Sequence, residues 1–279
     1  MPKAMLLTVL AMLAFAGNSV LCRLALDTTG IDPASFTSLR LISGAATLWL
    51  LVTLRGGSVT SQGSWPSAIA LFAYAAGFSW AYIHLDAGMG ALLLFAAVQV
   101  TMIGTGIVRG ERLTLPQQAG MALATLGLIA LLLPGTSAPP LPAALSMLAA
   151  GIAWGVYSLR GRGATNPTAV TSGNFLRTAP LAIILSLVML QNQSLDTEGV
   201  LYALASGAIT SGLGYAIWYA ALPLLRASVA ATVQLSVPVI TTLGGALLLA
   251  EPLTLRLSLT SAMILGGIAL VLTRPRKTG

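Results

Sequence analysis

The feature of this chain that most constrains its fold is a succession of long apolar segments separated by short loops. A helix needs about 20 apolar residues to cross the hydrocarbon layer of a membrane. Ten segments reach that length, at residues 4–26, 33–54, 65–84, 87–108, 114–134, 141–160, 167–190, 198–221, 226–249 and 254–273. Because the loops are short, neighbouring helices should pack antiparallel. The sequence therefore predicts an all-α membrane protein with ten transmembrane helices.

Composition excludes a soluble fold for these segments. Only 8% of the 279 residues are charged, whereas a soluble domain carries about 25%. The formal net charge of +7 comes from basic residues scattered singly between apolar runs. That scatter lacks the basic stripe typical of nucleic-acid binding. We therefore expect a lipid bilayer as the surroundings and no nucleic-acid partner.

The first segment has an alternative interpretation as a signal peptide. Ala14-Phe15-Ala16 resembles a cleavage site that follows a basic and then an apolar stretch. Apolar sequence resumes at Val20, however, and makes the whole run long enough to span a membrane. We interpret it as a retained first helix.

The two halves of the chain resemble each other on either side of a Pro- and Gly-rich midpoint. The breaker stretch at 134–140 predicts a linker, which gives two five-helix repeats at 1–138 and 139–279. The matching stretches are Asp32-Pro33 with Asn166-Pro167, Leu39-Arg40 with Leu176-Arg177, Ala96-Ala97-Val98-Gln99 with Ala231-Thr232-Val233-Gln234, and Gly110-Glu111-Arg112-Leu113-Thr114 with Ala250-Glu251-Pro252-Leu253-Thr254. Five helices in each half make the second half enter from the opposite side, which predicts an inverted repeat.

Charged residues between the segments predict which side of the membrane each loop faces. Cytoplasmic loops are enriched in Lys and Arg. With both termini cytoplasmic, the basic residues on that side are Lys3, Arg55, Arg109, Arg112, Arg160, Arg162, Arg226, Arg274, Arg276 and Lys277. The opposite side holds only Arg23 and Arg256, beside Asp27, Asp32, Asp86, Asp196 and Glu198. We therefore expect a multi-pass plasma-membrane protein with both termini in the cytoplasm.

These features together resemble the EamA-type members of the drug/metabolite transporter superfamily. They are the ten helices in two inverted halves, Leu-Arg in the second segment of each half, and the Gly-Glu-x-Leu-Thr box after the fourth. The resemblance covers nearly the whole chain, and the box at 110–114 with its partner at Glu251 is its most specific part. Within the superfamily the chain is most similar to YddG-type exporters of aromatic amino acids. The resemblance implies an exporter of the bacterial inner membrane with a central cavity between the halves.

Other function classes lack the residues that they need. The single Cys22 and the single His84 leave no two-histidine or cysteine-based metal site. No nucleophile–base pair and no glycine-rich phosphate loop is present. We therefore expect no enzyme, no cofactor and no metal, and a small-molecule substrate bound by a monomer or weak homodimer. A channel and a membrane-embedded enzyme are the alternatives from other classes.

Two glutamines inside apolar segments are candidates for substrate binding. A polar group in hydrocarbon is costly, so it usually faces a cavity or a neighbouring helix. Gln99 and Gln234 occupy matching positions in the two halves, and an amide suits both the ammonium and the carboxylate of a zwitterion. We place both in the cavity, with an interhelical hydrogen bond as the alternative.

Asn18, Trp154 and Tyr157 are the next candidates for substrate binding. Asn18 lies near the middle of the first segment, and the two aromatic residues lie in the matching stretch of the sixth. Polar and small groups that face aromatic rings would suit a flat substrate side chain. The alternative is a close helix crossing through Gly17 and Gly151.

Aromatic residues at two segment ends are candidates for binding and gating. An inverted repeat places equivalent residues on opposite faces of the membrane, and the repeat aligns Trp80 with Tyr215. We assign these two to substrate binding, and we assign to gating Tyr82, His84, Trp218, Tyr219 and Pro238, the last because proline kinks a helix. The alternative for the aromatic residues is an interfacial belt.

Two arginines and two glutamates have roles that the sequence leaves open. Arg40 and Arg177 lie some two turns inside matching segments, where each could snorkel, bind carbonyls at a broken helix or hold a substrate carboxylate. We interpret both as structural, with the carboxylate role as the alternative. Glu111 and Glu251 lie at helix ends, where capping and the helix dipole explain them.

The chain is therefore interpreted as an exporter or facilitator of amino acids, aromatic or large neutral ones. An exporter of drugs or other metabolites is the alternative in the same class. No Asp or Glu lies deep in an apolar segment, and proton movement through a membrane normally uses ionisable side chains along the path. We expect downhill, facilitated transport by alternating access.

Overall fold

The computed structural model describes residues 2–57, 62–110, 112–135, 138–161, 164–225 and 227–272, and every regular element in these ranges is helical. The first half contains α1 (Pro2–Thr28), α2 (Pro33–Leu54), α3 (Trp65–Tyr82), α4 (Ala87–Val108) and α5 (Leu115–Leu132). The second half contains α6 (Leu141–Arg160), α7 (Pro167–Val188), α8 (Thr197–Ala205), α9 (Gly214–Ala221), α10 (Ala227–Val233), α11 (Ser236–Leu248) and α12 (Leu255–Leu272). Two 3₁₀ turns, η1 (Leu190–Asn192) and η3 (Leu222–Leu224), and a π-helix, η2 (Ser206–Leu213), complete the fold.

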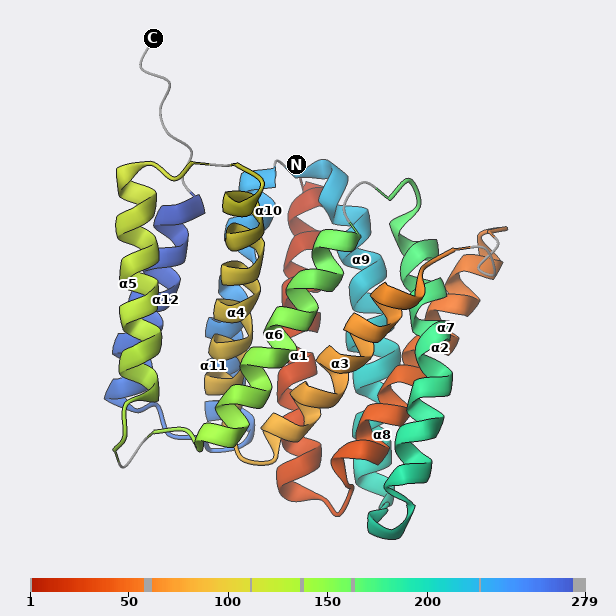
Figure 1. Ribbon diagram of the computed structural model, residues 1–279. Helices are drawn as coiled ribbons and strands as arrows, with labels where there is room; N and C mark the ends of the chain where they lie inside the picture. Colours follow the sequence, from red (N-terminus) through yellow and green to blue (C-terminus); the bar gives the residue numbers. More distant parts are fainter. Residues whose placement is uncertain are drawn as a thin grey trace.

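The helices form one bundle in which successive segments alternate in direction (Figure 1). Among the described residues, eight helices are long and apolar enough to span a membrane, the segment from α8 to η3 counting as one of them. The other two predicted segments, 65–84 and 226–249, are occupied by α3 and by α10 followed by α11. The predicted all-α fold with ten membrane segments is confirmed. α1 begins at the upper face of Figure 1, whereas α6 begins at the lower face.

The starts of the second helix in each half follow from local capping chemistry. The Asp32 carboxylate accepts hydrogen bonds from the backbone N–H groups of Ala34 and Ser35, and α2 begins at Pro33. The Asn166 side chain accepts from the backbone N–H of Ala169, and α7 begins one residue later, at Pro167. An oxygen at the N-cap satisfies free donors, and proline fits the first helical position. Both helices therefore begin with an N-cap side chain followed by proline.

Packing between the halves has the symmetry that a two-fold repeat would give. α2 packs against its counterpart α7, and α5 packs against its counterpart α12. α3 packs against α6, and the equivalent segment of α9 packs against α1. Small residues permit such contacts, since a Cβ at Gly120 of α5 would lie 2.6 Å from the Gly267 carbonyl oxygen of α12. A Cβ at Gly151 of α6 would lie 2.5 Å from the Leu94 carbonyl oxygen of α4. The close crossing that the sequence offered as an alternative for Gly151 therefore occurs, between α6 and α4.

Two helices of the second half are irregular near the centre of the bundle. In η2, backbone hydrogen bonds join residues five positions apart, which is the pattern of a π-helix. Such π-bulges often occur at functional sites. The ninth segment breaks between Val233 and Ser236, four residues before Pro238. Proline lacks an N–H and its ring clashes with the carbonyl four residues earlier, here that of Gln234. The break therefore leaves the Gln234 side chain at a discontinuity beside the cavity described next.

Candidate functional site

A cavity of about 530 Å³ lies between the two halves and reaches the face of the bundle where α6 and α9 end. The first half contributes Phe15, Val98 and Met102 to its lining. The second half contributes Trp154, Ser158, Gly161, Tyr215, Trp218, Tyr219, Leu222, Leu225, Ala230 and Gln234. Small-molecule sites are typically concave, mostly apolar and about 300–1,000 Å³ in volume, with few polar groups. The cavity has the size and chemistry of such a site.

Five aromatic residues line the cavity, and spacing places three of them on one face of α9. Residues three and four positions apart share a face of an α-helix, as do Tyr215, Trp218 and Tyr219 on α9. The rings of Trp154 and Tyr215 lie 5.2 Å apart across the α6–α9 boundary, and Phe15 of α1 lies 5.9 Å from Trp218. Such distances are typical of favourable aromatic pairs. The wall suits a flat or large apolar group.

The deep end of the cavity narrows to a void of about 30 Å³ beside a polar cluster on α1, α3 and η2. The Asn18 side-chain oxygen accepts hydrogen bonds from Ser206 Oγ at 2.7 Å and Thr210 Oγ1 at 3.3 Å. Its Nδ2 group donates to the Tyr74 hydroxyl at 3.3 Å. Asn18, Tyr74 and Thr210 all line the void. The amide of Asn18 is therefore held in one orientation by side chains from α3 and η2.

Arg40 lies behind this cluster and is almost completely buried. Its Nη2 donates to the Tyr74 hydroxyl at 2.9 Å, and its Nε donates to Ser211 Oγ at 3.3 Å. Its guanidinium carbon lies 5.1 Å from the centroid of the Tyr74 ring and 4.9 Å from that of Phe78. Aromatic faces attract cations at these distances. The interpretation of Arg40 as a snorkelling side chain is wrong, because the guanidinium is inside the protein.

An ion-pair cluster closes the opposite end of the bundle, beyond the void. Glu251 accepts hydrogen bonds from the backbone N–H of Ala87 at 2.9 Å and forms a salt bridge with Arg23 Nε at 3.3 Å. Arg23 also binds Asp27 and the backbone carbonyl oxygens of Tyr82 and Ile83. The predicted capping role of Glu251 is confirmed, and the helix that it caps is α4. The cluster ties α1, α3 and α4 to the α11–α12 loop.

The Glu251 carboxyl is partly withdrawn from water in this cluster. Burial raises the pKa of the Glu251 carboxyl above its usual range, and the nearby Asp86 carboxylate adds to the rise. The Ala87 N–H and Arg23 oppose this pKa shift because they favour the charged form.

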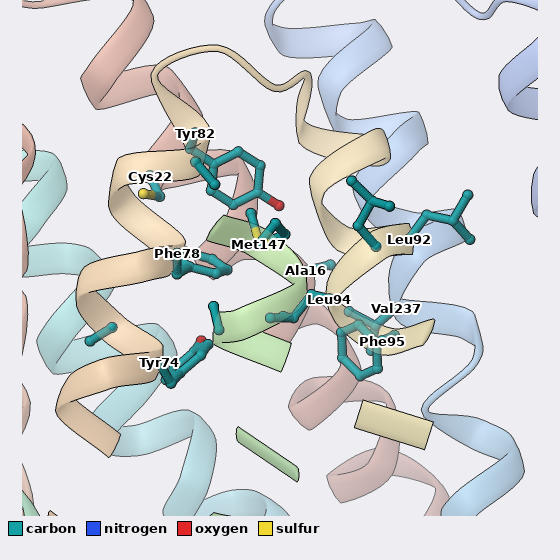
Figure 2. Close-up of a cluster of buried hydrophobic side chains, with 14 of the residues drawn as sticks. Ala16, Cys22, Tyr74, Phe78, Tyr82, Leu92, Leu94, Phe95, Met147 and Val237 are labelled. Atoms are coloured by element: carbon teal, nitrogen blue, oxygen red, sulfur yellow. The ribbon is translucent and has the colours of Figure 1, made fainter. Parts of the chain in front are cut away.

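Tyr82 belongs to the closed end as well. Its side chain is fully buried, and its hydroxyl donates to the Ala87 carbonyl oxygen at 3.1 Å. Gly90 makes room for the ring, because a Cβ at that position would lie 2.3 Å from it. Figure 2 shows Tyr74, Phe78 and Tyr82 in a column on α3 with their rings on one side of the helix. This column runs from the closed end to the void.

Most of the residues predicted to bind or gate do meet in this region. Those on the cavity or void are Asn18, Trp154, Tyr215, Trp218, Tyr219 and Gln234. Tyr157 stacks on Trp154 with ring centroids 5.2 Å apart and is buried behind it. Pro238 is buried in the first turn of α11, next to the break. These side chains come from α1, α6, α9, α11 and the break between α10 and α11.

Three predicted residues are not brought to the cavity. Trp80 is 52% exposed on the outer surface of α3, and His84 is exposed just beyond the end of that helix. Gln99 is buried but lines a separate void of about 20 Å³ between α4, α5 and α12. The geometry of the cavity gives no support to the roles predicted for these three.

Helical periodicity explains why Trp80 misses the cavity. Residues two positions apart on an α-helix point in nearly opposite directions. The spacing of four between Tyr74, Phe78 and Tyr82 defines the inward face of α3, and Trp80 therefore faces outward. This same spacing was the signal in the sequence that could have identified Tyr74 as a cavity residue.

Arg177 is held outside the cavity, unlike its counterpart in the first half. Its Nη1 donates to the backbone carbonyl oxygens of Gln62 and Gly173. Of the roles that the sequence left open, Arg177 binds backbone carbonyls, although these belong to the α2–α3 loop and to α7 itself and not to a broken helix. Glu111, the partner of Glu251 in the repeat, lies outside the described residues.

Comparisons with known proteins place the chain among transporters. The model of the EamA-like transporter family matches residues 2–133 and again 141–273. An uncharacterized protein of Pseudomonas aeruginosa is 58% identical over 271 residues, covering 97% of this chain and 94% of that protein. An uncharacterized transporter of Archaeoglobus fulgidus is 29% identical over 197 residues, 69% of this chain and 70% of that protein.

Two further similarities concern an exporter and a solved structure. A protein of Streptantibioticus cattleyicolor described as a probable terminal-alkyne amino-acid exporter is 28% identical over 181 residues, 62% of this chain and 60% of that protein. One crystal structure superposes with a TM-score of 0.68 at 22% identity and covers 96% of each chain. The last similarity concerns the fold alone.

Proposed function

Because the chain belongs to the EamA-like transporter family, we propose that it exports amino acids with large neutral or aromatic side chains. The observation that supports this most is the cavity of about 530 Å³ between the halves. Aromatic rings form much of its wall, the Gln234 amide lies on it, and the Asn18 amide lines the adjoining void. Rings suit the side chain of such a substrate, while amide groups suit its charged backbone atoms. The similarity to an amino-acid exporter points the same way.

Alternating access is the mechanism that we propose. The cavity reaches one face of the bundle, whereas Tyr82 and the Arg23–Glu251 ion pair close the other. Lys and Arg dominate the loops of the first face, which supports a cytoplasmic position for it. The structure then represents an inward-facing state that takes substrate from inside a bacterial cell. Opening requires Glu251 to leave the N-terminus of α4.

Facilitated transport is the energy mode that we propose. Among the described residues, every Asp and Glu lies in a loop or in the first or last turn of a helix. None of these carboxylates lines the cavity or the void. Proton relays through membranes normally need ionisable groups along the path. The substrate gradient of the cell would then drive export.

Transport by purified protein in sealed proteoliposomes tests this function. Efflux of radiolabelled L-phenylalanine should saturate and be inhibited competitively by tryptophan, tyrosine and leucine, and much less by aspartate or lysine. An imposed pH gradient should leave the final accumulation ratio unchanged when the membrane potential is clamped. Inhibition by hydrophobic drugs or other metabolites with none by amino acids would favour the alternative exporter, and flux without saturation would indicate a channel.

A further inference from the structure

Behind the residues that line the void, Arg40 carries a positive charge without a counter-ion among the described residues. Arg40 is 2% exposed, and the structure gives its guanidinium no carboxylate partner among the described residues. Its Nη1 is buried with no hydrogen-bond acceptor in the part of the chain that the structure describes. A buried cation is costly unless it is paired and hydrogen-bonded. The site is therefore incomplete in a way that an external anion would relieve.

The Tyr74 hydroxyl connects this charge to the void. It accepts hydrogen bonds from Arg40 Nη2 at 2.9 Å and from Asn18 Nδ2 at 3.3 Å. A phenol has two acceptor positions and one proton, so both acceptor positions are used and the proton is left to donate. Among the described residues no acceptor takes that proton, and Tyr74 itself lines the void. A hydroxyl that accepts from a guanidinium is a strengthened donor.

We propose that Arg40 and Tyr74 form a subsite for the carboxylate of the transported substrate. The void of about 30 Å³ has room for one or two waters, and the two carboxylate oxygens would take this space. The Tyr74 hydroxyl donates to one oxygen, and the guanidinium behind it supplies the compensating charge. The aromatic cavity next to the void then holds the substrate side chain, since Trp154 and Tyr215 line both spaces. This inference rests on the proposed function and specifies its substrate as a carboxylate.

Calorimetric binding by the full chain in lipid nanodiscs tests the subsite with three probes. L-phenylalanine carries both charges, phenethylamine lacks the carboxylate, and 3-phenylpropionate lacks the ammonium group. Tyr74→Phe should lower the affinity for L-phenylalanine and for 3-phenylpropionate about 10-fold or more, as expected for a lost hydrogen bond to a charged group. The affinity for phenethylamine should change less than about threefold. Arg40→Met should show the same selectivity with a larger effect.

Tyr202→Phe is the matched control, because the Tyr202 hydroxyl donates to Glu198 at 3.1 Å, away from the cavity. It should leave all three affinities unchanged. If Tyr74→Phe lowered the affinity for all three probes equally, Tyr74 would have a packing role. The subsite would then be overturned, while the transport proposal would stand. Wild-type binding of 3-phenylpropionate but not of any amino acid, with the same Tyr74 dependence, would support the anion subsite and overturn amino-acid export.

Discussion

Arg40 and Arg177 follow a leucine at matching positions of the two halves, yet they lie in opposite environments. Arg40 points into the bundle, where it contacts aromatic faces, Tyr74 and Ser211 and leaves Nη1 without an acceptor among the described residues. Arg177 donates to the carbonyl oxygen of Gln62, in the loop between α2 and α3, and to that of Gly173, one turn earlier in α7 itself. A repeat therefore conserves the position of a charge along the helix without conserving what the charge contacts.

The two glutamines of the repeat also differ, but here the member in the second half lies at the cavity, whereas in the arginine pair the member in the first half lies beside the void. Gln234 of the second half lies at a helix break and lines the cavity, whereas Gln99 of the first half lies in an unbroken helix and faces α5 and α12. The first half thus contributes the buried cation, and the second contributes the cavity amide. This asymmetry would suit the proposed substrate, whose two ends carry different charges.

The largest expected effect separates the two arginines. Arg40→Met should lower transport of L-phenylalanine by about 100-fold, because it removes the charge behind the subsite. Arg177→Met should leave the transport rate per folded molecule within about threefold. It should instead lower the free energy of unfolding by about 1–3 kcal/mol, since two carbonyl oxygens lose their donor. Transport in proteoliposomes and thermal unfolding in detergent measure the two quantities.

Equal effects of the two substitutions would break the comparison. If Arg177→Met abolished transport by well-folded protein, the two arginines would act alike and the repeat would be functionally symmetric. If Arg40→Met reduced only stability, Arg40 would be a structural residue, as the sequence alone suggested.

The glutamine pair should show the next largest effect. Gln234→Ala should weaken binding of L-phenylalanine by about 1–3 kcal/mol, the cost of leaving a polar partner unsatisfied. Gln99→Ala should change the affinity by less than about 0.5 kcal/mol, because Gln99 does not reach the cavity. Calorimetry on both variants provides the comparison. A larger loss for Gln99→Ala than for Gln234→Ala would contradict the assigned cavity.

Weakening the closed end should produce a smaller effect. Glu251→Ala removes both the ion pair with Arg23 and the acceptor of the Ala87 N–H, and it should raise outside labelling about threefold to tenfold at a buried cysteine, Ser19→Cys, in a Cys22→Ala background. Ser19 is 2% exposed and lines the void, so it reports opening of that end. A cysteine at the exposed position Leu195 corrects for reagent reactivity. Unchanged labelling would show that the ion pair does not hold this end closed.

A lower pH should modestly favour the closed form over the open form of the end that contains Glu251. The closed state raises the pKa of the Glu251 carboxyl, and opening returns this group to water and to its ordinary pKa. The closed state then binds more protons, so it gains stability as the pH falls from the raised pKa toward the ordinary value and loses it as the pH rises. Corrected labelling of Ser19→Cys should fall about twofold between pH 7 and pH 5. Persistence of this change in Glu251→Gln would assign it to another group.

The smallest effect is expected at Trp80. Because this side chain faces outward from α3, Trp80→Ala should change transport of L-phenylalanine by less than about twofold. Phe78→Ala, on the inward face, should cost about 3–5 kcal/mol of stability by leaving a core cavity. Transport and unfolding measurements on the two variants test the assigned faces of α3. Loss of substrate binding in Trp80→Ala alone would return Trp80 to the site.

The sequence by itself determined the helical segments, their N-caps and most of the cavity wall. Long apolar runs specify spanning helices because lipid offers backbone groups no hydrogen-bond partners. Asp32-Pro33 and Asn166-Pro167 specify helix starts because capping is local. Tyr215, Trp218 and Tyr219 share a face through spacing alone. Each of these features depends on residues within a turn or two of one another.

Only the tertiary structure decided which helix faces meet. Rotation of α3 and α4 about their axes turned Trp80 and Gln99 away from the cavity, although both lie near it along the chain. Arg40 gained its site from contacts with α3 and η2, whose residues lie 34 and 171 positions away. In an apolar segment every face can contact either lipid or protein, so hydrophobic patterning carries little information about rotation. Packing of small residues against neighbouring backbones supplies that information, and it exists only once the helices are assembled.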